Sequence, residues 1–491
     1  MNPSLLCETV TGTTTTELVA ARDAATRADM VELRLDGVTN PDVAQMLQGR
    51  RVPVIVTCRP RWEGGRFDGS EEERRRLLRS ALESGAEHVD IEWRADFADL
   101  IREYPQRVVV SSHDFSGVPD DLCGRVRAMR ATGAAVVKVA ITAARLSDTL
   151  PLLEIAKGGD AVVIGMSDAG MPSRLLAARF GSRWTYSGRG VAPGQVPTAV
   201  MLDRFRFRDA GADAAVYGVV GDNVMHSLSP VMHNAAFAAT GTDAVYVPLR
   251  AADFDDFLTF AERLGVAGAS VTIPFKQDAL RSASSADALT RQVGAANTLR
   301  RHAGVWEATN SDVDGFLEPL DSVVGSHSRE GMRASVLGAG GAARAVIVAL
   351  RSRGARVTVH ARRSEQAAEV AVSLGADVGP WPPLAGSWDL LVNCTPLGSA
   401  SAPTASPLPN GPFDGRAVYD LTYGREMSAL VRDAMRAGCV TLDGLPMLVA
   451  QAERQFEWWT GQRAPAGVMK AAALSETGRA EEMRKGIGPC T

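Results

Sequence analysis

The sequence predicts an α/β protein in which an N-terminal (β/α)8 barrel precedes a second α/β region of two domains. Three observations predict this fold class. Apolar runs of strand length recur about every 20 to 30 residues from residue 5 to about residue 190, and segments of helical periodicity separate them. A second series of such runs begins near residue 215, and a glycine-rich turn joins a strand to a helix near residue 338. An open eight-stranded sheet is the alternative for the first region.

The composition limits the classes to which the protein can belong. The 491 residues are 45% hydrophobic, have a formal net charge of −4 and exceed what one compact core holds, so several domains are expected. No run approaches the roughly 18 apolar residues of a spanning helix, and the first residues lack a secretory signal or an Arg/Ser-rich transit segment. The six cysteines are scattered without CxxC spacing, which predicts no disulfide framework, no metal and a reducing cytoplasm. Small-molecule partners are expected, rather than nucleic acid or a membrane.

The first region contains eight strand-like runs. They begin at Leu5, Met30, Val52, His88, Val108, Val136, Ala161 and Trp184. Segments from Glu71 and from Asp121 have the helical periodicity that a repeated βα unit requires. In such a barrel the chemistry lies at the carboxyl ends of the strands, and polar residues accumulate there in this sequence. Among them, Asp36 and Asp168 are interpreted as the solvated beginnings of loops.

A lysine stands out in the sixth run. Only five of the 53 basic residues are lysines, and Lys138 lies among valines and alanines in AAVVKVAI. Burial in an apolar strand favours a neutral amine, and neutral amines attack ketones to form imines that act as electron sinks. His113 is the candidate proton carrier, oriented by Asp114 or Glu63. Arginines would clamp a substrate carboxylate, and the candidates are Arg34, Arg59 and Arg174.

The second region starts after a boundary near residues 208–213, where strand-like and helical segments begin to alternate again. A further series of strands follows from Arg333. The predicted organisation is a barrel over residues 1–209, an α/β domain over 213–320, a nucleotide-binding domain over 321–445, helices over 446–478 that return to the domain of 213–320, and a tail over 479–491.

The turn Gly338-Ala339-Gly340-Gly341-Ala342-Ala343 follows the strand RASVL and opens a helix. This context is typical of a dinucleotide site, where the backbone approaches a pyrophosphate at a helix N-terminus. The next strand ends without an acid for a ribose hydroxyl. Arg362 and Arg363 follow it and suit a 2′-phosphate, which favours NADP over NAD. The alternative is that they are two surface arginines in an arginine-rich protein.

Two further residues are candidates for a proton relay. Lys276 follows the run SVTIP, and Asp312 lies in TNSDVDGF. The alternative for Asp312 is the N-cap of the helix that follows it. His226 and His233 are not expected to bind a metal, because no third ligand has a suitable spacing, and His226 is interpreted as a loop residue.

These motifs resemble two families. The first region is similar to type I 3-dehydroquinate dehydratase, through ELR at Glu32–Arg34, CRPRWEGG at Cys58–Gly65, SSHDF at Ser111–Phe115, VKVA at Val137–Ala140 and APGQ at Ala192–Gln195. The resemblance implies that Lys138 forms an imine with a C3 ketone, that His113 is the general acid and base, and that Glu63 assists it. It also implies substrate contacts by Glu32, Arg34, Arg59, Arg174 and Gln195. Val191 stands where the family usually has a serine.

The second region resembles shikimate dehydrogenase. The matching motifs are HSLSP (His226–Pro230), SVTIPFK (Ser270–Lys276), GAANTL (Gly294–Leu299), NSDVDGF (Asn310–Phe316), GAGGAA, NCTPLG (Asn393–Gly398) and GLPMLVAQAERQF (Gly444–Phe456). The resemblance implies that Lys276 and Asp312 are catalytic. It implies substrate contacts by Ser227, Ser229, Thr272, Asn297, Tyr423 and Gln451, and cofactor contacts by Gly338, Ala339, Gly340, Gly341, Ala342, Arg362, Arg363 and Thr395. The family's usual Asn-Arg-Thr at the cofactor phosphate is Ala361-Arg362-Arg363 here.

Together the two resemblances imply an enzyme of the shikimate pathway with two activities. 3-Dehydroquinate would lose water through a Schiff base, and the ketone of the product, 3-dehydroshikimate, would then be reduced with NADPH. The predicted fold becomes a (β/α)8 barrel followed by a two-domain α/β dehydrogenase with a Rossmann NADP-binding domain. The alternatives are a preference for quinate in the second region, a non-catalytic ligand-sensing role for one half, and an imine-forming aldolase.

Overall fold

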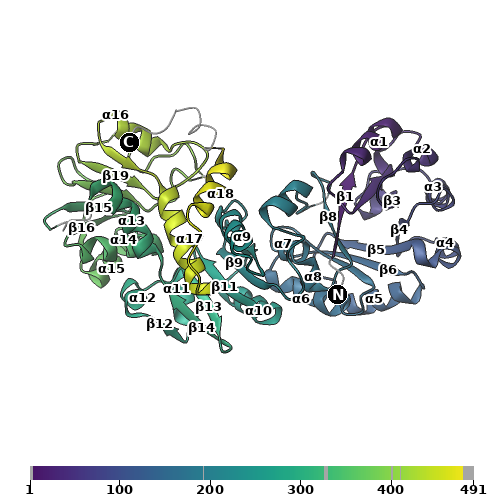
Figure 1. Cartoon of the computed structure of the whole chain (residues 1–491), viewed down its shortest axis with the longest axis horizontal. Coiled ribbons are helices and arrows are strands. Elements are labelled where there is room, and N and C mark those ends of the chain that lie inside the picture. Colours follow the sequence, from purple (N-terminus) through teal and green to yellow (C-terminus); the bar gives the residue numbers. More distant parts are fainter. Residues whose placement is uncertain (1–3, 192, 326–329, 400–401, 410, 479–491) are drawn as a thin grey trace. The chain divides into compact units, whose positions relative to one another are not determined.

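The computed structural model describes residues 4–191, 193–325, 330–399, 402–409 and 411–478 (Figure 1). The chain divides into two compact units. Unit 1 comprises Met1–Ala215 and Asp243–Gly265, and unit 2 comprises Val216–Thr242 and Val266–Thr491. The predicted tail over 479–491 lies outside the described residues.

Unit 1 is built on eight parallel strands, which form at the predicted places. They are β1 (Leu5–Val10), β2 (Met30–Arg34), β3 (Val54–Thr57), β4 (His88–Glu92), β5 (Val108–Asp114), β6 (Val136–Thr142), β7 (Ala161–Met166) and β8 (Trp184–Ser187). They lie in the order β7-β6-β5-β4-β3-β2-β1-β8. The predicted barrel is confirmed as a near-barrel. The ladder pairings of the described residues do not join β7 to β8, but the N–H of Arg183 donates to the carbonyl of Ala161 at 3.0 Å and links the two ends.

Helices and short turns alternate with these strands (Figure 1). The helices are α1 (Thr15–Ala24), α2 (Val43–Leu47), α3 (Glu71–Glu83), α4 (Ala98–Glu103), α5 (Leu122–Ala131), α6 (Leu150–Ala156), α7 (Met171–Leu175) and α8 (Ala177–Phe180), and β10 (Ala244–Arg250) and α10 (Phe254–Leu264) also belong to unit 1. Helix α3 begins where Ser70 Oγ accepts a hydrogen bond from the N–H of Glu73, and glutamates occupy its first turn. Every residue of β7 and β8 is buried, as parallel strands covered by helices require.

Unit 2 contains two sheets. In the first, β9 (Ala215–Gly221), β11 (Val266–Val271), β13 (Thr298–His302), β14 (Val305–Thr309) and β12 (Ser285–Ala286) lie side by side in that order. The second has six parallel strands in the order β17 (Asp377–Val378), β16 (Arg356–His360), β15 (Arg333–Leu337), β18 (Leu390–Asn393), β19 (Ala417–Asp420) and β20 (Val440–Leu442). Its core includes Val336, Val346 and Val392. The strand, glycine turn, helix and strand predicted from Arg333 form as β15, α14 (Gly341–Ser352) and β16.

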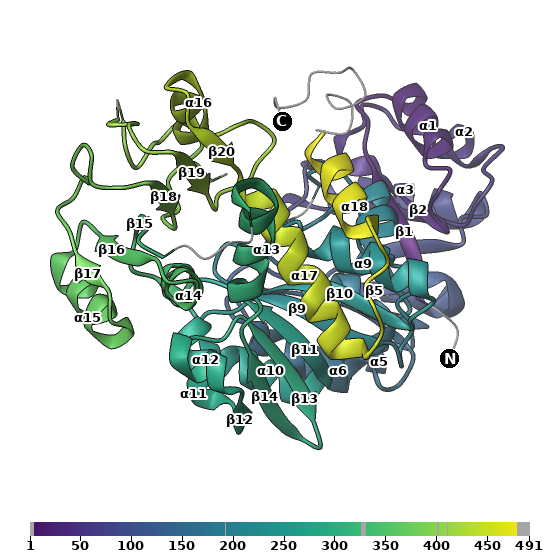
Figure 2. The same cartoon turned by 60° about the vertical axis from the view of Figure 1, so that its left-hand side comes forward.

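The other helices of unit 2 are α9 (Ser229–Thr240), α11 (Lys276–Ser282), α12 (Ala288–Val293), α13 (Asp312–Val324), α15 (Ser364–Leu374), α16 (Ala429–Arg436), α17 (Gly444–Thr460) and α18 (Val468–Thr477). Helices α13 and α17 lie side by side (Figures 1 and 2). This pairing brings the first turn of α13 close to Gln451 of α17, because Gly315 leaves the backbone of α13 near that residue.

Candidate active sites

Lys138 is the third residue of β6, and only 4% of it is exposed. Its Nζ donates to Asp90 Oδ2 at 3.0 Å, lies 3.5 Å from Glu32 Oε1 and lies 4.2 Å from the centre of the Tyr186 ring. The valines on either side of Lys138 in the sequence point to the opposite face of the strand, because side chains alternate along it. The amine is therefore surrounded by two carboxylates and an aromatic ring, which the apolar sequence around it did not predict.

Asp90 and Glu92 are candidate functional residues that the sequence analysis missed. They lie two positions apart in β4, so they face the same side of the sheet, and both are fully buried. Arg59 joins them, with Nη2 2.8 Å from Asp90 Oδ1 and Nη1 2.6 Å from Glu92 Oε1. Burial raises the pKa of Asp90, but Arg59 and Lys138 outweigh it and hold that pKa below its usual value. The available signal was the alternation of two acids with apolar residues in HVDIEW.

His113, near the end of β5, is held by Glu63. Glu63 Oε1 accepts a hydrogen bond from the backbone N–H of His113 at 2.9 Å and lies 3.0 Å from its Nδ1. Burial raises the pKa of Glu63 to about 7, and burial together with Arg59 and Lys138 lowers the pKa of His113 well below its usual value. Of the two predicted partners of His113, Glu63 is the one in place. Asp114 instead accepts hydrogen bonds from Ser116 and lies 3.3 Å from Arg125.

The arginines differ in how their charges are matched. Arg34 donates to both carboxylate oxygens of Asp36, at 2.8 and 2.9 Å, and the Asp36 side chain is 2% exposed. The interpretation of Asp36 as a solvated loop residue is therefore wrong, because the 3-10 turn over Leu35–Gly37 folds the carboxylate back onto Arg34. Arg174 is 1% exposed and forms no ion pair with a described residue. Its Nη2 donates to the carbonyl of Pro193 at 3.0 Å, and its Nε has no partner among the described residues.

These side chains surround a cavity of about 110 Å3 in unit 1. Its lining includes Glu32, Arg34, Arg59, Glu63, His113, Lys138, Arg174, Tyr186, Val191 and Gln195. Gln195 Nε2 donates to Thr9 Oγ1 at 3.1 Å, and Thr9 donates in turn to Glu32 at 2.9 Å. The structure therefore brings together all eight barrel residues to which the resemblance assigns a role. Burial lowers the pKa of Arg174 to about 10, so this guanidinium stays positive at neutral pH beside the cavity.

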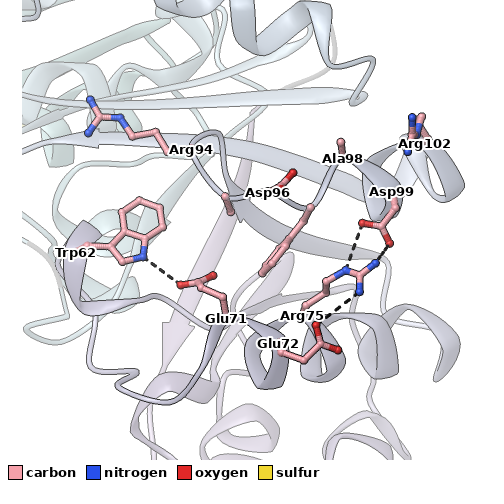
Figure 3. A pocket seen from close by; sticks show the side chains of 11 residues that line it. Trp62, Glu71, Glu72, Arg75, Arg94, Asp96, Ala98, Asp99 and Arg102 are labelled. Atoms are coloured by element: carbon pink, nitrogen blue, oxygen red, sulfur yellow. Dashed lines mark hydrogen bonds and ion pairs between the residues drawn. The ribbon is translucent and has the colours of Figure 1, made fainter.

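A larger, open hollow of about 650 Å3 lies over α3 and α4 (Figure 3). Trp62 Nε1 donates to Glu71 at 3.1 Å, and Arg75 forms an ion pair with Asp99. The polar side chains that line it are exposed or half-buried, and several of the charges match one another. Nothing in it presents a desolvated polar group to a ligand, so we regard it as a solvated surface feature.

In unit 2, Lys276 begins α11 and Asp312 begins α13. Lys276 Nζ lies 2.5 Å from Asp312 Oδ2, and Asn297 Nδ2 donates to Asp312 Oδ1 at 2.7 Å. The same amide nitrogen lies 3.0 Å from Gln451 Oε1. The N-cap alternative for Asp312 is wrong, because Ser311 occupies the N-cap position and both oxygens of Asp312 face Lys276 and Asn297.

These residues border a cavity of about 440 Å3. Its lining includes the predicted residues Ser227, Ser229, Thr272, Lys276, Asn297, Asp312, Ala342, Thr395, Tyr423 and Gln451. Ser227 Oγ accepts a hydrogen bond from the N–H of Ser229 at 3.1 Å. Sequence reasoning missed Ser270 and Gln455, which also line the cavity and are joined by a 2.7 Å hydrogen bond. His226 lies in a turn, as predicted, and borders the cavity as well.

The glycine turn lies between β15 and α14. Gly338 has a φ of 106°, and a Cβ there would lie 3.3 Å from the carbonyl oxygen of Cys394, so both the backbone and the packing favour glycine. Gly340 is exposed, and a Cβ there would meet nothing within 4 Å. Arg362 and Arg363 follow β16 and are exposed, and neither forms an ion pair with a described residue. The exposed backbone of this turn, at the N-terminus of a helix, fits the pyrophosphate of a dinucleotide. The two arginines without ion-pair partners among the described residues fit an additional phosphate.

The described residues form neither a metal-binding cluster nor a membrane-spanning helix. In the part of the chain that the structure describes, no three His, Cys, Asp or Glu side chains are grouped to hold a metal ion. None of the described helices is long and apolar enough to cross a lipid bilayer.

Comparison with known proteins identifies the family. Residues 6–211 match type I 3-dehydroquinase, residues 219–299 the shikimate dehydrogenase substrate binding domain, and residues 444–474 the shikimate 5'-dehydrogenase C-terminal domain. The chloroplastic bifunctional 3-dehydroquinate dehydratase/shikimate dehydrogenase of Arabidopsis thaliana is 34% identical over 503 residues, which cover 94% of this chain and 83% of that protein.

Other relatives match the second region alone. The shikimate dehydrogenase (NADP(+)) of Synechocystis sp. is 39% identical over 274 residues, covering 52% of this chain and 94% of that protein. The crystal structure of shikimate 5-dehydrogenase from Thermus thermophilus, in complex with NADP(H) and shikimate, is 34% identical, with a TM-score of 0.48 over 53% of this chain and 99% of that one. Because the similarity to the Arabidopsis protein spans both units, this chain belongs to the family of bifunctional 3-dehydroquinate dehydratase/shikimate dehydrogenases.

Proposed function

We propose that unit 1 dehydrates 3-dehydroquinate to 3-dehydroshikimate and that unit 2 reduces 3-dehydroshikimate to shikimate with NADPH. The chain is thus a lyase and an oxidoreductase of the shikimate pathway. One observation supports this most directly. Each unit encloses a lysine in a cavity together with the group that would move or hold a proton, His113 for Lys138 and Asp312 for Lys276.

In the dehydration, Lys138 Nζ attacks the C3 ketone, and loss of water gives a protonated imine. The imine withdraws electrons and acidifies the adjacent C2–H bond. His113 removes that proton, and the electrons form the C1–C2 double bond as the C1 hydroxyl leaves. His113 returns the proton to this hydroxyl, which departs as water, and hydrolysis of the imine restores Lys138.

The substrate carboxylate is assigned to Arg174. No carboxylate of the described residues pairs with this buried guanidinium. Arg34, by contrast, is already paired with Asp36, and Arg59 is paired with Asp90 and Glu92. A bound carboxylate would therefore compensate a charge that the fold leaves open. We assign Arg34, Arg59, Glu32 and Gln195 to the ring hydroxyls and to fixing the electrostatics of the cavity.

In the reduction, Lys276 Nζ holds the substrate carbonyl oxygen and supplies its proton. Asp312 keeps Nζ in place, and Asn297 orients Asp312. The proposed substrate contacts are Ser227 and Ser229 at the carboxylate, with Thr272, Tyr423 and Gln451 around the ring. NADPH, when bound, supplies the hydride. The turn Gly338–Ala342 and the first turn of α14 would hold its pyrophosphate, Arg362 and Arg363 its 2′-phosphate, and Thr395 would lie beside it.

The domain organisation and the compartment are also proposals. We assign the dehydratase to residues 1–209, the substrate-binding domain to 213–320 with the helices of 446–478, and the NADP-binding domain to 321–445. Residues 243–265, which group with unit 1, are kept in the substrate-binding domain because they lie within the matched range 219–299. We place the protein in the cytoplasm, since its described cysteines, Cys7, Cys58, Cys123, Cys394 and Cys439, are all free thiols and suit a reducing compartment.

A coupled assay with 3-dehydroquinate and NADPH tests this function. Lys138→Ala should abolish NADPH consumption from 3-dehydroquinate but leave the reduction of 3-dehydroshikimate intact. Lys276→Ala should spare dehydration and cripple reduction. If either variant, still folded, lost both reactions, the assignment of one reaction to each unit would be wrong. Running the reverse reaction with quinate and with shikimate decides which of the two unit 2 prefers.

The covalent step has its own test. Borohydride added during turnover should reduce the imine and leave a stable adduct on the peptide that contains Lys138. Normal dehydration with an unmodified peptide would exclude the imine route. The same treatment of Lys138→Ala is the control for reaction at other amines.

A further inference from the structure

Gly341 is a glycine that the dinucleotide fingerprint does not require. In the pattern G-x-G-x-x-G the first two glycines are Gly338 and Gly340, and the third position is Ala343, so Gly341 falls at an unspecified place. Its backbone does not adopt a positive φ. It is also the first residue of α14, where alanine would be the better helix former. Neither the backbone nor the cofactor pattern explains it.

The stem of Lys276 occupies the space that a side chain at position 341 would need. A Cβ at Gly341 would lie 2.8 Å from Cδ of Lys276, 3.2 Å from its Cβ and 3.4 Å from its Cγ. Carbon atoms in contact are usually about 3.5 to 4.0 Å apart, so the first two distances are too short. The lysine stem lies directly against the glycine backbone.

Lys276 cannot simply withdraw from such a side chain. Its backbone is held at the start of α11, where its carbonyl accepts a hydrogen bond from the N–H of Ala296 at 2.8 Å. Its Cβ therefore stays near position 341, and the shortest contact, with Cδ, is relieved by rotating the rest of the side chain. Since Nζ lies 2.5 Å from Asp312 Oδ2, such a rotation moves the amine away from its carboxylate.

We propose that Gly341 is a positioning residue for the reduction, because its missing side chain leaves the channel through which Lys276 reaches Asp312 and the substrate. The inference rests on the proposed catalytic role of Lys276. According to this inference, two glycines of the turn have different roles. Gly340 leaves space open to the cofactor, and Gly341 leaves space that the proton donor fills.

The two glycines form a matched pair for the test. Gly341→Ala should lower kcat for the reduction of 3-dehydroshikimate at least about tenfold. Position 341 would contact the pyrophosphate through its backbone, which alanine retains, so the Kd for NADPH, measured by fluorescence titration, should change much less than kcat does. Gly340→Ala places its methyl group at an exposed position with no described protein atom within 4 Å. The proposed function puts the cofactor on this side of the turn, so the variant should bind NADPH more weakly, and its Kd and KM for NADPH should rise. A Gly341→Ala variant with unchanged kcat, or with the loss only in NADPH affinity, would overturn the proposal.

A double variant separates this inference from the function on which it rests. In Lys276→Ala the channel is empty, so adding Gly341→Ala should cost no further rate. If Lys276→Ala alone reduces the substrate normally, the proposed function fails. If Lys276→Ala is slow and Gly341→Ala slows the enzyme by the same factor with or without the lysine, only the positioning role fails. Should Gly341→Ala not fold, the double variant has room for the methyl group and should fold, and a second failure would contradict the steric argument.

Discussion

Glu63 and His113 are joined at two atoms of the histidine. Glu63 Oε1 accepts the backbone N–H of His113 at 2.9 Å and lies 3.0 Å from its Nδ1. When Glu63 is ionised, Nδ1 donates its proton to the carboxylate and Nε2 is the nitrogen left to accept a proton from the substrate. When Glu63 is protonated, it can donate to Nδ1, and Nε2 then bears the hydrogen. The protonation of Glu63 therefore decides whether His113 can act as a base.

This relationship predicts the pH dependence of dehydration. Because the pKa of Glu63 is raised to about 7, kcat/KM for 3-dehydroquinate should fall as the pH drops below about 7. Glu63→Gln cannot ionise, so its lower activity should lack that limb. The measurement is the initial rate of enone formation across the neutral range. If kcat/KM of Glu63→Gln still fell with the same midpoint pH, a group other than Glu63 would be responsible for the pH dependence.

The same shift predicts a change in stability with pH. The folded protein binds a proton at Glu63 that the unfolded chain, with a carboxyl pKa of about 4.5, has already released at neutral pH. The contribution of Glu63 to stability is therefore greatest at low pH and is lost as the pH rises from about 4.5 to about 7. Glu63→Gln should unfold at a higher temperature than the wild type at about pH 8 and show no such advantage at about pH 4.

Arg174→Met should separate substrate affinity from stability. The change removes a buried, unmatched charge, so the thermal midpoint should rise or stay constant. The KM for 3-dehydroquinate should increase about 10- to 100-fold, because a charge-assisted contact with the substrate carboxylate is lost. Arg34→Met is the matched control. It leaves Asp36 buried without its partner and should lower the thermal midpoint. If Arg174→Met bound substrate normally, another group would hold the carboxylate.

Asn297→Asp should impair the reduction by disturbing Asp312. The amide nitrogen that donates to Asp312 Oδ1 would be replaced by a second carboxylate, which repels it. We expect kcat for 3-dehydroshikimate reduction to fall about 100-fold. Dehydration measured on the same sample should be unchanged, and equal loss of both reactions would indicate unfolding instead.

Arg362→Ala should weaken the preference for NADPH. If the guanidinium binds the 2′-phosphate, kcat/KM with NADPH should fall about tenfold or more while the value with NADH stays the same. Arg363→Ala, measured in parallel, shows how the two arginines share this contact. If kcat/KM fell equally with NADPH and with NADH, Arg362 would not bind the 2′-phosphate.

The strands of unit 1 were predictable because parallel strands covered on both faces form continuous apolar runs, and Lys138 was conspicuous in such a run. Its surroundings were not predictable. Asp90 reaches Lys138 from β4 although β5 lies between their strands, and such contacts depend on side chains that point to the same face of a curved sheet. Local periodicity contains no information on which residues of distant strands meet.

Asp36 shows the same limit at short range. It lies two residues after Arg34, just beyond a strand, where a solvated acid is the ordinary expectation. The 3-10 turn over Leu35–Gly37 instead closes a buried, two-point ion pair. In unit 2 the glycine turn was found from its strand and helix context, whereas the contact of Gly341 with Lys276 joins segments 65 positions apart in the chain and became visible only in the folded structure.

The scarcity of lysine has a practical consequence for handling the protein. Lys157 and Lys470 are exposed, whereas Lys138 is 4% exposed and the Lys276 side chain 13%. Among the described lysines, amine-directed coupling to a sensor surface or a dye should reach Lys157 and Lys470 before Lys138 and Lys276. Brief labelling should therefore modify these surface amines before the lysine of either cavity.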